Sequence, residues 1–204
     1  MRKERIRGLV LDYGGVLTLP QHTASVDRMV AHLEVDRDAF RRVYRARRPA
    51  YDSGLVTGEQ YWRGVVEGCG LDPDEVDLSY LIAQDVQSWT QLNEAMVGFV
   101  REVRSRVYRL AIISNMTRNT LVSMREHFEW LALFDECVFS CELGTNKPGR
   151  EIYEHCIRRL GLRADECLFV DDSADNAQGA RDVGMAAIRF ECVKQFLAAL
   201  EEFE

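Results

Sequence analysis

Short runs of apolar residues alternate with longer amphipathic stretches over most of this chain. Continuous apolar runs predict β-strands at residues 6–11, 108–113, 137–140, 166–170 and 186–190. Apolar residues at three- and four-residue spacing predict helices at residues 93–105, 118–130, 150–160, 174–183 and 193–203. Strands that alternate with helices favour a parallel sheet, and uninterrupted apolar strands fit a sheet buried on both faces. We therefore expect a doubly wound α/β core.

A long segment between the first two strands, residues 19–91, lacks any strand-like alternation. Helical spacing is present there instead, first at 25–33 and then at 38–48. We expect an all-helical insertion after the first strand. In this interpretation residues 1–18 and 92–204 form the core domain, and residues 19–91 form a helical cap domain.

Two more helices are expected in the second half of this insertion. Thr57 and Gln60 have the spacing of a capping box, in which each side chain satisfies a free backbone amide. The helix that they open should reach residue 66. Asp72, followed by Pro73 at a first helical position, predicts a further helix that runs to residue 89.

Polar residues follow four of the predicted strands, directly or after a short loop. They are Asp12, Ser114-Asn115, Lys147 and Asp171-Asp172. Ligands of open parallel sheets bind outside the carboxyl ends of the strands, so these residues should meet at one rim of the sheet. The rim would then hold carboxylates, a hydroxyl and an ammonium, a combination that suits phosphoryl chemistry on a metal ion.

The acidic residues have the most specific chemistry. Asp12 precedes Gly14 and Gly15, which allow a sharp turn and a close approach to a ligand. A carboxylate there can attack phosphorus and form an aspartyl-phosphate, which divides the transfer into two easier steps. Asp171 and Asp172 beside Asp12 would repel it unless a cation offsets the charge, and a few hard oxygen ligands favour Mg²⁺. The alternative for the acidic pair is a helix N-cap.

Lys147, Ser114 and Asn115 are the expected phosphate contacts. Lys147 is one of three lysines in a chain with 26 lysines and arginines, and it precedes a predicted helix. An ammonium acts on phosphate as a compact point charge, whereas a guanidinium spreads its charge over a fork. Ser114 offers a hydroxyl and Asn115 a backbone amide to a phosphate oxygen.

In this order the motifs resemble those of the haloacid dehalogenase superfamily, in particular subfamily IA-like members with an α-helical C1 cap. The resemblance implies a Rossmann-like core and, in most members, a Mg²⁺-dependent phosphatase of a small phosphorylated metabolite. The implied catalytic residues are Asp12 as nucleophile, Ser114 and Lys147. The implied metal ligands are Asp12, the Gly14 carbonyl and Asp172, with Asp171 acting through water.

Gly14 departs from the family pattern. Family phosphatases usually have an aspartate two residues after the nucleophile, which protonates the leaving group. General acid–base catalysis contributes about 10²–10⁴-fold, so Gly14 predicts slow turnover or a substrate with a good leaving group. It speaks against a phosphomutase. Two alternatives stay open: a non-catalytic or weakly active binding or regulatory protein of this fold, and a metal-independent 2-haloacid dehalogenase, which would not need Asp171 and Asp172.

Composition narrows the partners. The net charge of −7 argues against nucleic acid, and no apolar run approaches the roughly 20 residues of a membrane span. No signal sequence is recognisable, so we expect a cytoplasmic protein whose six cysteines are reduced. The basic run 37–48 contains Arg41, Arg45 and Arg48 on one helical face. It is either a solvated surface or a cluster that steers an anionic substrate.

Overall fold

A five-stranded parallel sheet forms the centre of the molecule. The structure is a computed structural model that describes residues 6–104 and 109–203. Its strands are β1 (Gly8–Leu11), β2 (Arg109–Ser114), β3 (Glu136–Phe139), β4 (Cys167–Asp171) and β5 (Ala186–Arg189). They lie in the order β3-β2-β1-β4-β5, as expected for a doubly wound sheet. The predicted ends at residues 105 and 108 fall outside the described residues.

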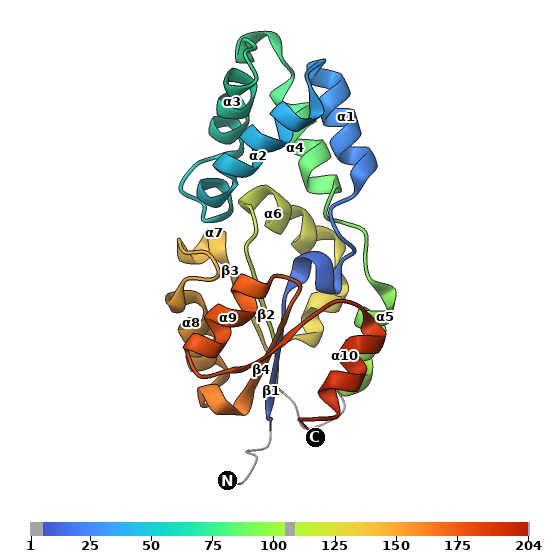
Figure 1. The fold of residues 1–204 in the computed structure, drawn as a ribbon, viewed down its shortest axis with the longest axis vertical. Helices are drawn as coiled ribbons and strands as arrows, with labels where there is room; N and C mark the ends of the chain where they lie inside the picture. Colours follow the sequence, from blue (N-terminus) through green and yellow to red (C-terminus); the bar gives the residue numbers. More distant parts are fainter. Residues whose placement is uncertain (1–5, 105–108, 204) are drawn as a thin grey trace.

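Helices cover both faces of this sheet because its strands are apolar on both sides. One face packs against α8 (Arg150–Leu160) and α9 (Ala174–Asp182), and the other against α5 (Glu94–Val103) and α10 (Val193–Leu200) (Figure 1). Within β1, Leu9 and Leu11 join the cluster on the second face, whereas Val10 joins the cluster on the first. The alternation of a strand thus divides the core into two layers.

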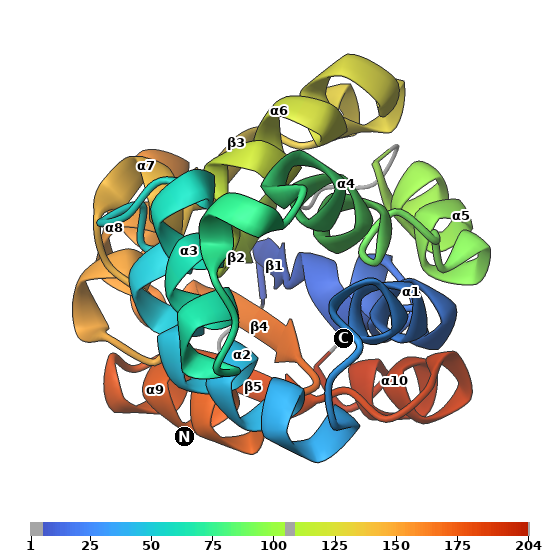
Figure 2. The same cartoon turned by 90° about the horizontal axis from the view of Figure 1, so that it is seen from above.

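The helical insertion (residues 19–91) lies beyond the carboxyl ends of the strands (Figure 1). It contains α1 (Thr23–Leu33), α2 (Arg37–Asp52), α3 (Gly58–Gly68) and α4 (Leu78–Gln87). These helices share their own hydrophobic cluster, which includes the fully buried Trp62. An isolated antiparallel bridge between Thr18 and Leu92 joins the two connections of the insertion to the core. Figure 2 looks down through these helices onto the sheet.

The first three predicted helices of the insertion are present with different bounds: α1 begins at Thr23 rather than at residue 25, and α3 ends at Gly68 rather than at residue 66. α3 has the predicted capping box at Thr57 and Gln60. α2 continues to Asp52, four residues past the predicted end, although Pro49 inside it removes one backbone amide from the helix. The additional helical turn places Asp52 at the boundary with the core.

The predicted helix from Asp72 to residue 89 is wrong. Asp72 caps only a short 3₁₀ turn, Pro73–Glu75. The chain is extended at Val76, and Asp77 then caps α4 by accepting a hydrogen bond from the Tyr80 amide. Two aspartates five residues apart were both good caps, and the sequence did not show which one opens the longer helix.

Helix α6 and several shorter elements also belong to the core. Helix α6 (Arg118–His127) ends earlier than predicted and is followed by the 3₁₀ turn Glu129–Leu133. The helical turn η1 (Tyr13–Leu17) after β1 and the short α7 (Ser140–Leu143) after β3 were not predicted. Of the helices described, none combines the length and the apolar composition needed to cross a membrane.

Candidate active site

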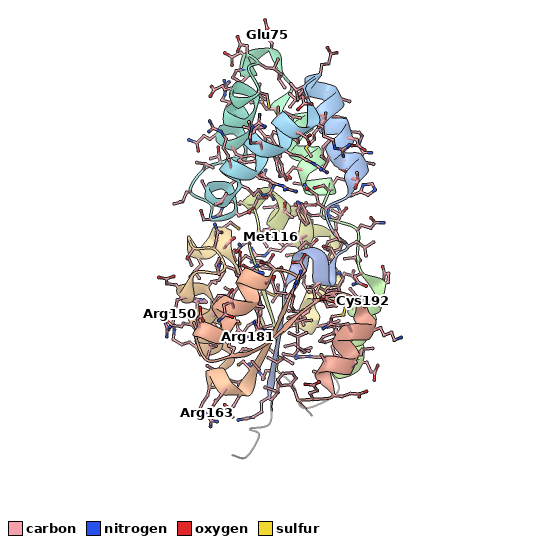
Figure 3. All side chains as sticks on the ribbon, viewed as in Figure 1. Glu75, Met116, Arg150, Arg163, Arg181 and Cys192 are labelled. Carbon is pink, nitrogen blue, oxygen red and sulfur yellow. The ribbon has the colours of Figure 1, made fainter. Side chains whose placement is uncertain are left out.

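The predicted site residues converge at the carboxyl ends of β1, β2 and β4. Carboxylate oxygens of Asp12, Asp171 and Asp172 all lie within 4.8 Å of one another. Lys147, which follows α7, extends its ammonium into the same group. This rim can be located in Figure 3 by the label of Met116, which lies just past β2, between the helical insertion and the sheet. The motifs that were separated in sequence are therefore neighbours in space.

The Lys147 ammonium lies between two of these carboxylates. Its Nζ lies 2.7 Å from Asp12 Oδ1 and 2.6 Å from Asp171 Oδ2, and it donates to the Ile113 carbonyl at 3.1 Å. Burial disfavours the charged ammonium, but the two carboxylates outweigh this effect and raise the pKa of Lys147. Lys147 therefore stays positively charged although it is almost fully buried.

Asp12 is held by hydrogen bonds at one of its oxygens. Oδ1 contacts Lys147 Nζ and accepts a hydrogen bond from the Tyr13 amide at 2.7 Å. Among the described residues none donates to Oδ2. Burial raises the pKa of the Asp12 carboxyl; Lys147 opposes the rise, and Asp171 and Asp172 add to it. A positive charge near these three acids would offset that repulsion.

The two acids of the pair have different surroundings. Asp171 is fully buried, and its oxygens accept from Ser173 N at 2.8 Å, from Asn176 Nδ2 at 3.0 and 3.1 Å, and from Lys147. Asp172 is exposed as a residue, but its carboxyl is partly shielded from water; this shielding and, after it, repulsion from Asp171 raise the pKa of Asp172. Ser173 is the residue that caps α9. The acidic pair therefore is not the N-cap of that helix.

Gly15 shapes the space beside Asp172. Its φ of +77° is a conformation that favours glycine, and a Cβ built on it would lie 2.5 Å from Asp172 Oδ2. The absent side chain leaves room for a ligand next to that oxygen. Three carboxylates within 4.8 Å of one another and a close-packed glycine turn fit a small divalent cation with hard oxygen ligands.

Ser114 and Asn115 are placed near Lys147 but serve it differently. Ser114 is buried and lines a cavity over the rim. The Asn115 side chain accepts from the Lys147 amide at 2.7 Å and donates to the Lys147 carbonyl at 3.0 Å. Asn115 therefore ties two loops together with its side chain, and only its backbone amide is left for the expected phosphate contact.

A cavity of about 420 Å³ lies over these residues, between the core and the helical insertion. Asp12, Ser114 and Lys147 line it from the core. From the insertion it is lined by Gln21, Tyr44, Arg45, Arg48, Asp52 and Trp89. A bound molecule would thus be in contact with both parts of the chain.

The Trp89 side chain leaves little space beside Gly14. The backbone of Gly14 (φ −71°, ψ 126°) is open to any residue, but its Cβ would lie 3.2 Å from Trp89 Cζ3. The indole thus occupies the direction in which a side chain at position 14 would extend. Trp89 packs against the core and also lines the cavity.

The basic run divides into residues with different surroundings. Arg41 is exposed, and Arg45 is exposed but lines the cavity. Arg48 is mostly buried; its Nε lies 2.8 Å from Asp52 Oδ1 and its Nη1 lies 2.8 Å from Asp85 Oδ1. The solvated surface describes Arg41, whereas Arg45 and Arg48 belong to the cavity wall.

Sequence reasoning missed the polar network around Arg48. The Tyr44 hydroxyl donates to Asp85 Oδ1, and Gln21 Nε2 donates to the Tyr44 hydroxyl at 2.9 Å. Arg48 and Asp52 are four residues apart, a spacing at which helical ion pairs form, so this contact could have been found. Asp85 comes from another helix, and no pattern in the sequence links it to Arg48.

The family can now be stated. Residues 6–184 match the model of haloacid dehalogenase-like hydrolases. Because this match covers most of the chain, the chain belongs to that hydrolase family. The resemblance inferred from the four motifs is therefore confirmed.

Two curated relatives give the range of similarity. Mouse bifunctional epoxide hydrolase 2 is 25% identical over 98% of this chain, which is 38% of that protein's own length. A sesquiterpene phosphatase of Aspergillus oryzae is 29% identical over 65% of this chain and 71% of its own length. The chain thus spans well under half of the epoxide hydrolase.

Solved structures share the fold. A HAD family enzyme from Bacteroides thetaiotaomicron superposes with a TM-score of 0.79 at 18% identity, over 97% of this chain and 99% of that one. A structure of that enzyme in complex with magnesium and inorganic phosphate superposes with a TM-score of 0.73. A dehalogenase has a TM-score of 0.65 at 22% identity, over 91% of this chain and 85% of its own. At these identities the likeness shows the Rossmann-like fold alone.

Proposed function

We propose that this chain is a Mg²⁺-dependent phosphatase that hydrolyses a small phosphorylated metabolite through an aspartyl-phosphate on Asp12. The observation that carries the proposal is the position of Lys147 Nζ between Asp12 and Asp171, next to Asp172. An ammonium and three carboxylates gathered at one rim suit the transfer of a dianionic phosphoryl group with a divalent cation. The magnesium and phosphate complex of the Bacteroides enzyme supports the same assignment.

Each side chain has a role that follows from its contacts. Lys147 and the Tyr13 amide hold Asp12 through Oδ1, so Oδ2 is available to form the bond to phosphorus. Ser114, the Asn115 amide and Lys147 would bind the oxygens of the transferred group. Asp171 orients Lys147 through the 2.6 Å contact.

Magnesium would be held by Asp12, Asp172 and the Gly14 carbonyl, with Asp171 at a greater distance through water. When bound, it supplies positive charge to the phosphoryl oxygens and offsets the repulsion among the carboxylates. We also propose that the helical insertion (residues 19–91) acts as a cap on the core (1–18 and 92–204). Its contribution to the cavity wall would exclude bulk water during the first transfer.

The test is release of phosphate from p-nitrophenyl phosphate, whose leaving group needs little protonation. We expect turnover with Mg²⁺, loss of turnover in excess EDTA, and a fall of about 10³-fold or more for Asp12→Asn. The matched control is Asp175→Asn, an exposed acid on α9 that does not line the cavity, which should keep the parent rate.

Two other outcomes would replace the proposal. Release of halide from 2-haloacids in EDTA would assign a dehalogenase, a class present among the structural matches. Mg²⁺ binding by calorimetry with no turnover on a broad metabolite panel would assign a binding or regulatory protein. Phosphatase activity that persists without metal would contradict the site as described.

A further inference from the structure

The cavity holds one carboxyl group that the proposed mechanism does not use. In the described part of the chain, the acids that line the cavity are Asp12, Asp52 and Asp172. Asp12 is the proposed nucleophile and Asp172 a proposed metal ligand. Asp52, at the last residue of α2, is left without a function, while position 14, where a proton donor would be expected, is a glycine.

The end of α2 is anchored to the core, which fixes Asp52 over the site. The backbone carbonyl of Asp52 accepts a hydrogen bond from Ser140 Oγ at 2.5 Å. One turn earlier, the Pro49 carbonyl accepts from Asn146 Nδ2 at 2.7 Å, and Asn146 is the neighbour of Lys147. Both hydrogen bonds come from the segment that carries Lys147, so they fix the position of the Asp52 residue relative to the rim.

The surroundings of Asp52 favour its protonated form. Arg48 is the guanidinium beside it, and Arg48 also contacts both oxygens of Asp85, at 2.8 and 2.9 Å. The side chains are mostly buried, with exposed fractions of 16% for Arg48, 13% for Asp52 and 0% for Asp85. One buried cation can neutralise one carboxylate well, so a second buried acid in the same cluster is shifted toward its neutral form.

Asp85 accepts more hydrogen bonds in this cluster than Asp52 does. Asp85 accepts from the Tyr44 hydroxyl as well as from Arg48, whereas Asp52 contacts Arg48 through Oδ1 alone. Burial raises the pKa of Asp52, against the lowering effect of Arg48, and Asp85 adds to the rise. Charged and titratable groups around Asp52 are Arg48, Asp85, Lys147, Tyr51 and Tyr61.

We propose that Asp52 is the general acid and base of this enzyme, supplied from the helical insertion in place of the side chain missing at Gly14. This inference rests on the proposed phosphatase function. As Asp12 forms its bond to phosphorus, the bond to the leaving oxygen breaks and the proton of the Asp52 carboxyl moves to that oxygen. In the second step the Asp52 carboxylate takes a proton from water as the water oxygen forms a bond to phosphorus; the bond between Asp12 and phosphorus breaks, and phosphate is released.

The experiment compares two aryl phosphates of nearly the same size with Asp52→Asn. p-Nitrophenyl phosphate has a good leaving group, and phenyl phosphate has a poor one that depends on protonation. We expect kcat/KM to fall a few-fold for p-nitrophenyl phosphate and about 10²-fold or more for phenyl phosphate. Asn keeps the shape and the hydrogen bond to Arg48, and Asp52→Glu, which keeps a proton donor, should recover part of the loss.

The dependence of the parent's activity on pH is a second test, and it does not require that a variant folds. Activity on phenyl phosphate should decline at high pH as Asp52 ionises, and the decline should be weaker with p-nitrophenyl phosphate. An equal loss on both substrates in Asp52→Asn, or no loss on either, overturns the role of Asp52. Failure of the parent on p-nitrophenyl phosphate would instead overturn the phosphatase assignment itself.

Discussion

Gly14 and Gly15 are adjacent in the chain but are required for different reasons. Gly14 has an ordinary backbone conformation, and it is the Trp89 indole that leaves little space for a side chain there. Gly15 has a positive φ and faces Asp172 Oδ2. Sequence reasoning identified both as turn residues and identified the missing acid at position 14. It could not show that an aromatic side chain from residue 89 fills that direction.

Gly15→Ala should damage the proposed metal site. The new Cβ would lie 2.5 Å from Asp172 Oδ2, so the carboxylate must move, and the positive φ adds about 1–2 kcal/mol of strain. We expect the Mg²⁺ concentration for half-maximal activity to rise by about 10-fold or more, read from a metal titration with p-nitrophenyl phosphate.

Gly144→Ala is the matched control for this prediction. Gly144 has a φ of +82°, but no atom lies within 4 Å of the position of its Cβ. It should therefore bear similar backbone strain and lose similar stability without a change in the requirement for Mg²⁺. Equal shifts of the metal titration in both variants would mean that backbone strain alone explains the effect.

Elements of secondary structure followed their local sequence where one start or stop signal dominated. Helix α8 has the predicted bounds, 150–160, and ends at Gly161, whose φ is +67°. The prediction of a helix from Asp72 was wrong because Asp72 and Asp77 are both suitable N-caps. The long helix starts after Asp77, and its Leu81 packs in the hydrophobic cluster of the insertion. Local signals thus fix the type of an element better than its ends.

Asp135, which joins β2 to the start of β3, should make the stability of the fold depend on pH. Asp135 Oδ2 accepts from the Leu110 amide and from Arg104 Nη1, each at 2.8 Å. Burial alone would raise the pKa of Asp135, but the Leu110 amide and Arg104 outweigh it and lower the pKa. Its stabilising effect should therefore be complete above the unfolded pKa of about 3.9 and disappear as pH falls through the folded pKa.

Asp135→Asn mimics the protonated carboxyl and checks this sign. The variant should be less stable than the parent at pH 7, and the difference in free energy of unfolding should shrink below about pH 4. Denaturant unfolding at several pH values measures it. A difference that stays constant down to pH 3 would show that the charge of Asp135 is not the cause.

At the scale of the whole molecule, the site is made by contact between two parts of the chain. The core supplies Asp12, Lys147 and the acidic pair, and the insertion supplies Arg48 and Asp52. Gly54, just after α2, lies against the backbone of Cys141: its Cβ would be 2.7 Å from the Cys141 carbonyl oxygen. This close approach holds the end of α2 at the rim.

Gly54→Ala should push the helical insertion away from the core. Backbone atoms of Cys141 cannot move as a side chain can, so we expect kcat/KM to fall by roughly 10-fold or more through misplacement of α2. Gly70→Ala is the control within the insertion, since Gly70 has a φ of +83° and open space around its Cβ position. If the two variants were equally active, the close contact between Gly54 and Cys141 would not be needed for activity.

The sequence by itself determined the doubly wound sheet, the helical insertion and the residues at the rim, because strand ends of a parallel sheet gather whatever follows them. Asp12, Lys147 and the acidic pair could be found this way since each adjoins a strongly apolar strand or its loop. Only the tertiary structure decided that Asp171 holds Lys147 while Asp172 stays accessible, and that Asp52 enters the cavity. Those outcomes depend on contacts between residues far apart in the chain, which local patterns do not encode.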